Sequence, residues 1–330
     1  MKTIAFDMMG NDNGIQSGAE AVISFVEKNL DYTFILVGDK VEINRYTKET
    51  ERIRIIDNKN EIDKSGGIRS ARNSDSSMSV AINLVKTGQA DAVISSGESG
   101  IYLSMTTLQL KRIPGVVRPA FMPIFPTIIK DKRFAFLDAG ANLETNAKML
   151  VQWADFGKIF SSKVLKTKNP KVGIINIGTE DTKGHDFHKE AHEILKKNQN
   201  INYVGFVEPR ELLNGVVDVA VVDGYAGNMV LKSMEGAVLS LLKLIRSEIK
   251  SKLIYKIGAI FSRGAFKNVK EVLDYRNVGG GWVVGLQGLA IKAHGSSDKK
   301  AYLGALSQIK EALDNQALEK IKEAIGGNND

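Results

Sequence analysis

Six short apolar runs along the chain predict buried strands. They cover residues 3–6, 34–37, 92–94, 134–137, 172–177 and 219–222, and each is followed at once by Asp, Gly or Ser. Continuous apolar runs of this length are typical of strands that are covered on both faces. Between them, helical spacing of apolar positions recurs over residues 18–28, 77–87, 145–156, 187–198 and 298–313. This alternation predicts an α/β fold with a doubly wound, mostly parallel sheet, in which ligands bind at the carboxyl ends of the strands.

Residues 229–266 interrupt the alternation with a long stretch that contains no clear strand. Its apolar positions step by three or four, as on one face of a helix: Val238, Leu242, Ile245, Ile249 and Leu253, continued by Ile254, Ile257 and Phe261. The spacing predicts two helices that project from the sheet and meet near residues 251–255. We therefore expect one α/β domain of two lobes over residues 1–330, with projecting amphipathic helices over residues 229–275.

The charge of the chain is concentrated in this projecting stretch. The 330 residues carry a formal net charge of +7, and residues 232–276 hold ten basic and four acidic side chains. A local basic patch indicates a local anionic partner, such as a membrane surface, an acidic protein or a nucleic acid. Nucleic acid is the least favoured of the three, because few aromatic residues are interleaved with the basic ones and no recognised module is present.

Two absences narrow the class of protein further. The chain has no cysteine, which excludes disulfides, cysteine-ligated metal sites and a cysteine nucleophile. No uninterrupted apolar stretch reaches about 18 residues, the length needed to span a bilayer, and the first residues lack the apolar core of a signal peptide. We expect a cytoplasmic protein, peripheral at the inner face of the cell membrane if the basic helices meet lipid.

Five junctions between a strand and the following turn are rich in glycine and polar residues. They lie at residues 7–12, 95–100, 138–142, 176–180 and 223–228. Free backbone amides at such turns bind anions, so their convergence on one edge of the sheet predicts a site for a phosphate-bearing ligand. Lys183, beside Gly184, would contact a phosphate or a developing oxyanion, or else be a solvated loop lysine. No GxGxxG or GxxxxGK[ST] motif is present, so neither a dinucleotide site nor a P-loop is predicted.

Two further patterns involve histidine. Residues 294–298 read His-Gly-Ser-Ser-Asp before a predicted helix, which fits a helix N-cap and a phosphate-binding turn equally well. His185, His188 and His192 share one helical face, but no HExxH motif is present, so a solvated surface is favoured over a metal site. The GxSxG motif of serine hydrolases is also absent.

Taken together, the motifs resemble the bacterial phosphate acyltransferases of the PlsX type from Ile4 to about Ala312. The resemblance rests on ordered blocks at residues 7–12, 75–78, 95–100, 118–120, 137–142, 176–184, 223–228 and 294–298. It implies an isocitrate/isopropylmalate dehydrogenase-like fold, shared with phosphate acetyltransferases, and a homodimer without a nicotinamide or other cofactor. It also implies the transfer of a fatty acyl group from acyl carrier protein to inorganic phosphate, which gives acyl phosphate for phospholipid synthesis.

The alternatives are a phosphate acetyltransferase that uses a coenzyme A thioester and an inactive membrane-associated scaffold. Two positions depart from the usual family pattern. Asn11 replaces a glycine, and asparagine tolerates positive φ, so we expect the turn to survive. Glu98 replaces an amide, and its carboxylate would repel a phosphate.

The resemblance, with the anion-ready motifs, implies the following site. His294, Ser296 and Ser297 would hold phosphate, Lys183 would neutralise charge, and Asp223 and Asn228 would orient the ligand or His294. Further expected contacts are Gly295, Gly10, Gly97, Gly178, Asn142, Ser76, Ser77 and Arg72. Phosphate itself attacks and a thiolate leaves, so no enzyme nucleophile is needed. Contact with lipid or carrier protein would come from Lys243, Arg246, Lys250, Lys252, Lys256, Leu253 and Ile257, the alternative being a dimer interface with solvated lysines.

Overall fold

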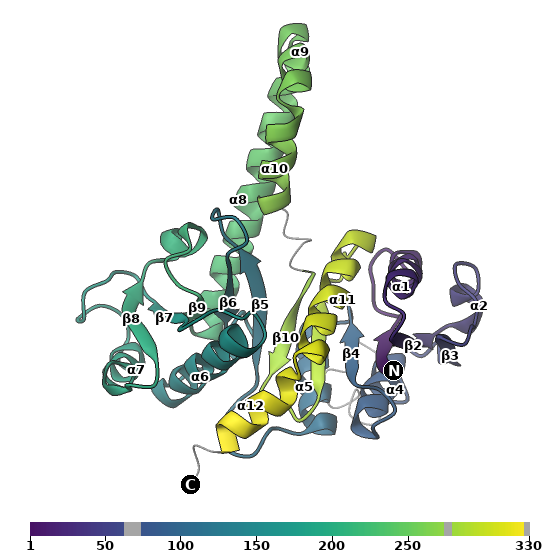
Figure 1. The fold of residues 1–330 in the computed structure, drawn as a ribbon, viewed down its shortest axis with the longest axis horizontal. Helices are drawn as coiled ribbons and strands as arrows, with labels where there is room; N and C mark the ends of the chain where they lie inside the picture. Colours follow the sequence, from purple (N-terminus) through teal and green to yellow (C-terminus); the bar gives the residue numbers. More distant parts are fainter. Residues whose placement is uncertain (63–73, 274–278, 327–330) are drawn as a thin grey trace.

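The computed structural model describes residues 1–62, 74–273 and 279–326. Their core is an 11-stranded sheet with the order β3-β2-β1-β4-β11-β10-β5-β6-β9-β7-β8 (Figure 1). The strands are β1 (Lys2–Asp7), β2 (Tyr32–Gly38), β3 (Ile53–Asp57), β4 (Ala92–Ser95), β5 (Ala120–Pro126), β6 (Arg133–Leu137), β7 (Lys171–Ile175), β8 (Asn202–Val207), β9 (Val219–Val221), β10 (Gly280–Val284) and β11 (Leu289–Ala293). All six predicted strands are present, and the sheet is mostly parallel, as expected.

The two halves of the sheet run in opposite directions. Strands β3, β2, β1, β4 and β11 are parallel to one another, and so are β6, β9, β7 and β8. Between them, β10 is antiparallel to both β11 and β5, and β5 is antiparallel to β6. The prediction that five glycine-rich junctions converge on one sheet edge is therefore wrong. The junctions after β1 and β4 leave one edge, whereas those after β6, β7 and β9 leave the other.

Helices cover both faces of the sheet, and each face has its own apolar cluster. The first face is covered by α1 (Gln16–Lys28), α6 (Ala147–Lys163), α7 (Asp186–Lys197), α11 (Lys299–Asp314) and α12 (Ala317–Gly326). The second face is covered by α4 (Ser77–Lys86), α5 (Ser99–Leu110) and the base of α8 (Gly224–Ser251). Short helices α2 (Lys40–Ile43) and η2 (Pro209–Asn214) lie in connections. Because the strands are covered on both sides, their sequences are continuously apolar, as the pattern indicated.

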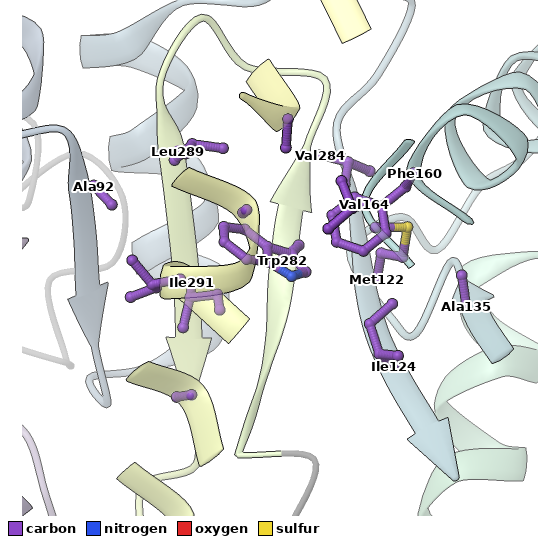
Figure 2. Packing of buried hydrophobic residues seen from close by; sticks show 14 of the residues in the cluster. Ala92, Met122, Ile124, Ala135, Phe160, Val164, Trp282, Val284, Leu289 and Ile291 are labelled. Carbon is purple, nitrogen blue, oxygen red and sulfur yellow. The ribbon is translucent and has the colours of Figure 1, made fainter. Parts of the chain in front are cut away.

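The antiparallel hairpin β10–β11 joins the two halves. Trp282 of β10 lies opposite Met122 of β5 and Ile291 of β11, and its ring packs against Phe160 of α6 with 6.0 Å between ring centroids. Figure 2 shows this side chain among the apolar residues of β5, β11 and α6. The large aromatic side chain of Trp282 therefore packs between the central strands and the helices that cover the first face of the sheet.

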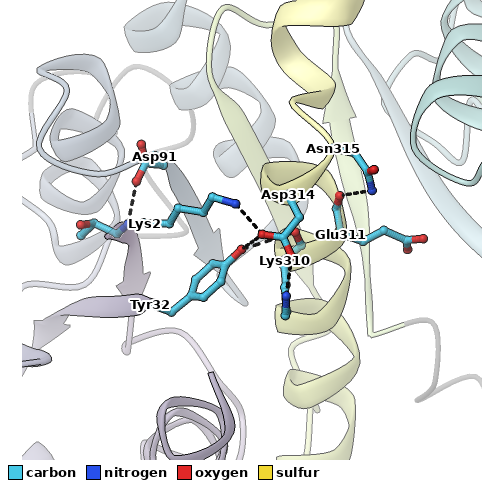
Figure 3. A network of polar contacts seen from close by, with 8 residues as sticks. Lys2, Tyr32, Asp91, Lys310, Glu311, Asp314 and Asn315 are labelled. Atoms are coloured by element: carbon cyan, nitrogen blue, oxygen red, sulfur yellow. Dashed lines mark hydrogen bonds and ion pairs between the residues drawn. The ribbon is translucent and has the colours of Figure 1, made fainter. Parts of the chain in front are cut away.

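Helix α11 also connects the two halves, through polar side chains at its carboxyl end. Asp314 accepts hydrogen bonds from Lys2 of β1 and from Lys310, and the Tyr32 hydroxyl of β2 donates to it at 2.7 Å (Figure 3). One turn earlier, Glu311 forms a two-pronged ion pair with Arg133 of β6 at 2.9 and 3.0 Å. The helix is thus attached to both sets of strands.

The basic stretch forms a helical hairpin that projects away from the sheet (Figure 1). Helix α8 ends at Ser251, α9 (Leu253–Phe261) begins after Lys252, and α10 (Arg263–Leu273) continues toward the sheet. Of the 28 residues of α8, only Gly224 and Gly227 at its base are buried, and α9 has no buried residue. Among the described helices, none is both long and apolar enough to cross a bilayer.

Candidate active site

A cleft of about 730 Å³ lies over the second face of the sheet. Its floor is formed by β5, β10 and β11, one wall by the start of α5, and the other wall by α8. Phe121, Pro123 and Phe125 of β5 give the floor an apolar part, and the turn after β11 gives it a polar part. Although the two sets of junctions leave opposite edges of the sheet, members of both reach the cleft because it lies between them.

The turn at residues 294–297 is held in place by the loop after β1. Its carbonyl oxygens accept hydrogen bonds from the Asp12 amide (to Gly295, 2.8 Å), the Asn11 side chain (to Ser297, 3.0 Å) and the Asn13 side chain (to Ser296, 3.3 Å). These oxygens would repel an anion if they were free. Asp298 then caps α11, accepting a hydrogen bond from the Ala301 amide at 2.9 Å. The predicted N-cap is confirmed.

Asn11 does more than tolerate a turn. Its side-chain amide donates both to Ser297 and to the Tyr302 hydroxyl, the latter at 2.6 Å. The positive φ in this loop belongs to Gly10, at 79°, and Asn11 is not among the residues with positive φ. The turn is present, as expected, but it does not draw on the tolerance of asparagine for positive φ. A Cβ on Gly10 would lie 2.9 Å from the Gly97 Cα, so this position requires glycine for two reasons.

Asp7, the last residue of β1, directly precedes the same loop. It is buried and accepts hydrogen bonds from the hydroxyls of Ser77 at 2.7 Å and Ser95 at 2.6 Å. Burial raises the pKa of Asp7 to about 6, although these hydrogen bonds oppose the rise. Ser77 therefore contacts Asp7, while Ser76 caps α4 through the Ser79 amide.

Glu98 occupies the amino terminus of α5. Its carboxylate accepts hydrogen bonds from the amides of Gly100 at 2.9 Å and Ile101 at 2.6 Å. These are the amides that an anionic ligand would use at a helix amino terminus. In this protein a side chain of the helix itself takes them.

The opposite wall begins with the cap of α8. Asp223 accepts a hydrogen bond from the Ala226 amide at 2.9 Å, and its carboxylate lies 3.4 Å from Nε2 of His188. Burial alone would raise the pKa of Asp223, but the contacts with His188 and Ala226 lower it below its ordinary value. Further along the helix, Asn228 lies in the cleft beside Gly140.

The loop after β6 packs against the base of α8. The Asn142 side chain donates to Asp138 at 2.9 Å and to the Pro119 carbonyl at 2.8 Å. Burial raises the pKa of Asp138, which also accepts backbone hydrogen bonds. Asn142 therefore shapes the loop and does not line the cleft.

The structure brings seven of the predicted site residues together in the cleft: Gly10, Gly97, Asn228, His294, Gly295, Ser296 and Ser297. Six others lie outside its lining: Lys183, Gly178, Asp223, Asn142, Ser76 and Ser77. The Lys183 side chain is exposed, on a loop held by the Asn176 side chain, which donates to the Lys183 carbonyl at 3.1 Å. Arg72 lies outside the described residues.

Besides Glu98, four charged side chains of the cleft were not predicted as site residues: Asp12, Lys232, Glu235 and Lys292. His294 has Glu235 as a partner, with 3.9 Å between Nε2 and Oε1. Lys292 is the one charged residue in the apolar run of β11, so the sequence does contain a signal for it. Lys232 and Glu235 lie in α8, where many other residues are charged, so the sequence does not distinguish them.

The prediction of a solvated histidine face on α7 is wrong. His188 and His192 are 5 % and 4 % exposed, because this face of the helix packs on β8 and on the start of α8. His192 bonds to the Tyr203 hydroxyl at 2.8 Å and stacks on Phe206. In the described part of the chain, no group of three or more His, Asp or Glu side chains is arranged to hold a metal ion.

A mostly parallel, doubly wound sheet with helices on both faces and a cleft over one of them defines a protein of the α/β class. The family model for "Fatty acid synthesis protein" matches residues 2–320, and the chain belongs to that family.

Curated relatives agree with the family assignment, and a solved structure agrees with the fold. The chain is 54 % identical to the phosphate acyltransferase of Mycoplasmopsis pulmonis and 51 % identical to that of Mycoplasma mobile, covering 98 % of this chain and all of each relative. A phosphotransacetylase structure from Streptococcus pyogenes superposes with a TM-score of 0.60 over 96 % of this chain and 94 % of its own, at 18 % identity. The expected sharing of a fold with phosphate acetyltransferases is confirmed.

Proposed function

We propose that this protein transfers a fatty acyl group from acyl carrier protein to inorganic phosphate and so supplies acyl phosphate for phospholipid synthesis. The observation that carries the proposal is the turn at residues 294–297. It combines hydroxyls, an imidazole and a fixed backbone beside an apolar floor. Such a cleft suits a reaction between an anion and an acyl chain, and relatives of the same length are phosphate acyltransferases.

The chemistry needs little beyond binding and orientation. A phosphate oxygen forms the new bond to the thioester carbon, and the carbon–sulfur bond breaks with its electron pair passing to sulfur. Hydrogen phosphate loses one proton and the departing thiolate gains one, so the step is balanced. Because phosphate is the nucleophile, the enzyme contributes proximity and charge stabilisation.

In this proposal His294, Ser296 and Ser297 hold the phosphate, and Asn228 on the facing wall orients the thioester. Asp223 supports Asn228 indirectly, since it caps the helix that carries Asn228. Lys183 would neutralise charge from the loop after β7, where its side chain is exposed.

Release of carrier thiol from acyl-(acyl carrier protein), measured with and without phosphate, tests the function. Acyl phosphate is trapped with hydroxylamine, and acetyl-coenzyme A and long-chain acyl-coenzyme A are run in parallel. Phosphate-dependent thiol release from the carrier substrate supports the proposal. Activity confined to acetyl-coenzyme A would make the protein a phosphate acetyltransferase, and no activity on any substrate would favour a scaffold.

The site assignment has its own test. We expect His294→Ala and Asn228→Ala each to lower kcat/KM by about 100-fold, the usual loss when one preorganised donor is removed. The control for Lys183→Ala is Lys168→Ala, which changes an exposed lysine elsewhere in the chain. The control for His294→Ala is His185→Ala, which changes an exposed histidine outside the cleft. Full activity of the His294 or Lys183 variant would overturn that residue's assignment.

We propose three contacts for the helical hairpin, one at its tip and two along its shaft. Near the tip, Leu253 and Phe261 are 73 % and 86 % exposed, beside the basic residues Lys250, Lys252 and Lys256. Exposed apolar side chains next to lysines are typical of helices that lie on anionic lipid. We propose that the tip, including Ile257, binds the inner face of the cell membrane, near the place where acyl phosphate is used.

Along the shaft of α8, Leu239, Leu241 and Leu244 are about half exposed, and these apolar side chains would contact a second copy of the chain in a homodimer. Lys243 and Arg246 lie on the same shaft and would steer an acidic carrier protein.

Flotation with vesicles separates these roles. The protein is expected to float with vesicles that contain phosphatidylglycerol and to float less with neutral phosphatidylcholine, and Lys250→Gln with Lys252→Gln should reduce flotation. Equal failure to float with both vesicles would remove the lipid contact. Sedimentation of the same samples without lipid reports the dimer independently.

A further inference from the structure

Lys292 is a charged residue in the middle of an apolar sheet. It lies on β11, opposite Ser95 of β4 and Gly281 of β10, and it lines the cleft. The other residues of the strand are apolar and buried. A partly buried lysine at such a position is unfavourable unless its ammonium group has a partner, and the obvious partner would be a carboxylate.

The described residues provide no ion pair for it. The Lys292 ammonium donates one hydrogen bond, to the Ala293 carbonyl, and no carboxylate in the described ranges lies within 4.0 Å in a salt bridge with it. An ammonium group has three N–H donors. Lys292 therefore presents hydrogen-bonding capacity and positive charge at the floor of the cleft.

A second group with unused hydrogen-bonding capacity also lines the cleft. Ser297 is 2 % exposed and lines the cleft, yet its hydroxyl oxygen has no hydrogen-bond partner. Its backbone is fixed, because its carbonyl accepts the Asn11 side chain at 3.0 Å. A buried hydroxyl that has no hydrogen-bond partner in a polar cleft indicates a ligand that provides the missing partner.

At this place the Lys292 ammonium attracts an anionic ligand, and the neighbouring carboxylates repel it. The titratable groups that face Lys292 are Asp7, Asp12 and Glu98, with Lys232, Glu235 and His294 further around the lining. Burial lowers the pKa of Lys292 to about 8, and the three carboxylates oppose the decrease. The ammonium is thus charged at neutral pH. Lys183, the cation expected from the sequence, is not in the cleft.

We propose that Lys292 is a phosphate-binding residue of the acyl transfer, its ammonium and the Ser297 hydroxyl both bonding to the attacking phosphate. This inference rests on the proposed function and adds a residue to it. Phosphate has enough acceptor oxygens to satisfy both groups at once. Charge-assisted bonds of this kind are the strong ones, so Lys292 offsets the repulsion from the neighbouring carboxylates.

The test replaces the ammonium while keeping the length of the side chain. Lys292→Met should raise the KM for phosphate at pH 7 by at least about tenfold, the loss of one charge-assisted bond, with the KM for the acyl donor changed less than about twofold. Lys299→Met, an exposed lysine at the start of α11, is the matched control. Thermal unfolding of both variants reports whether the fold is retained.

A pH series adds a readout that a structural role would not move. The phosphate KM of the wild type should rise as the pH passes through about 8, and Lys292→Arg, which stays protonated, should lack that rise. Comparing the two proteins cancels the ionisation of phosphate itself. A lower kcat with an unchanged phosphate KM, or no change in either, would overturn the proposal.

Binding of inorganic phosphate alone keeps this test separate from the proposed function. Phosphate should raise the unfolding temperature of the wild type and of Lys299→Met, and raise that of Lys292→Met much less. If the wild type showed this shift but no thiol release, the proposed acyl transfer would be rejected, and the assignment of Lys292 as a phosphate-binding residue would be kept. If Lys292→Met bound phosphate as the wild type does, the Lys292 assignment would fail whatever the activity.

Discussion

Glu98 is the side chain of the cleft that most directly opposes an anionic substrate. It takes the Gly100 and Ile101 amides for itself and adds negative charge near Lys292. We expect Glu98→Gln to lower the KM for phosphate about three- to tenfold, because one nearby unit charge is removed while the cap keeps an acceptor. Measurement at pH 6.5 keeps Lys292 protonated in both proteins.

The control for this change is Glu190→Gln, an exposed glutamate of α7 outside the cleft lining, which should leave the KM unaltered. A phosphate KM that stays the same or rises in Glu98→Gln would mean that the carboxylate helps to hold the site together more than it repels the ligand.

At the scale of the element, α8 contains two glycines that should respond in opposite ways to alanine. A Cβ on Gly227 would collide with the Asp138 carbonyl, whereas a Cβ on Gly236 would meet nothing within 4 Å. Alanine favours helices over glycine by about 1 kcal/mol. Gly236→Ala should therefore stabilise the protein by up to that amount, and Gly227→Ala should destabilise it by about 1–3 kcal/mol through overpacking. Urea unfolding decides, and a gain of stability in both variants would contradict the packing at the base of α8.

The elements also show what the sequence pattern contained and what it lacked. The continuous apolar strands were predictable, because a strand that is buried on both faces has apolar residues at nearly every position. Strand β10 begins with Gly280 and Gly281, and β5 contains Pro123, residue types that argue against strands. The pairing of Gly281 with Pro123 allows both, but it joins segments distant in the chain and leaves no local signal.

The same limit applies to the site. The helix cap at Asp298 was predictable, because the residues that make a cap are neighbours in the chain. Strand direction is not local, so the reversal through β10 and β5 could not be read from apolar runs, and the five junctions were expected on one edge. The charge of Lys292 is visible in the sequence, but its place in the cleft depends on its neighbours across the sheet, Ser95 and Gly281, which are distant in the chain.

At the scale of the whole molecule, α11 holds the two oppositely directed halves of the sheet together, so its polar attachments should contribute to global stability. Burial alone would raise the pKa of Asp314, but Lys2, Lys310 and Tyr32 lower it well below its ordinary value. A carboxyl group with a lowered folded-state pKa stabilises the folded state above its unfolded-state pKa, and this contribution disappears as the pH falls through the folded-state value. The stabilisation is screened because the side chain is 38 % exposed, and it should amount to about 1 kcal/mol.

We therefore expect Asp314→Asn to lower the free energy of unfolding by about 1 kcal/mol at pH 7, with the same difference at pH 5 and a smaller one below about pH 4. Glu311→Gln breaks only the pair with Arg133 and tests the attachment to the other half of the sheet. If α11 fastens the halves into one cooperative unit, urea unfolding followed by Trp153 and Trp282 fluorescence and by circular dichroism should give coincident transitions in the wild type. The double variant should separate the two transitions, because the strands on either side of β10 then lose their common helix. Coincident transitions in the double variant would show that the β10–β11 hairpin alone couples the halves.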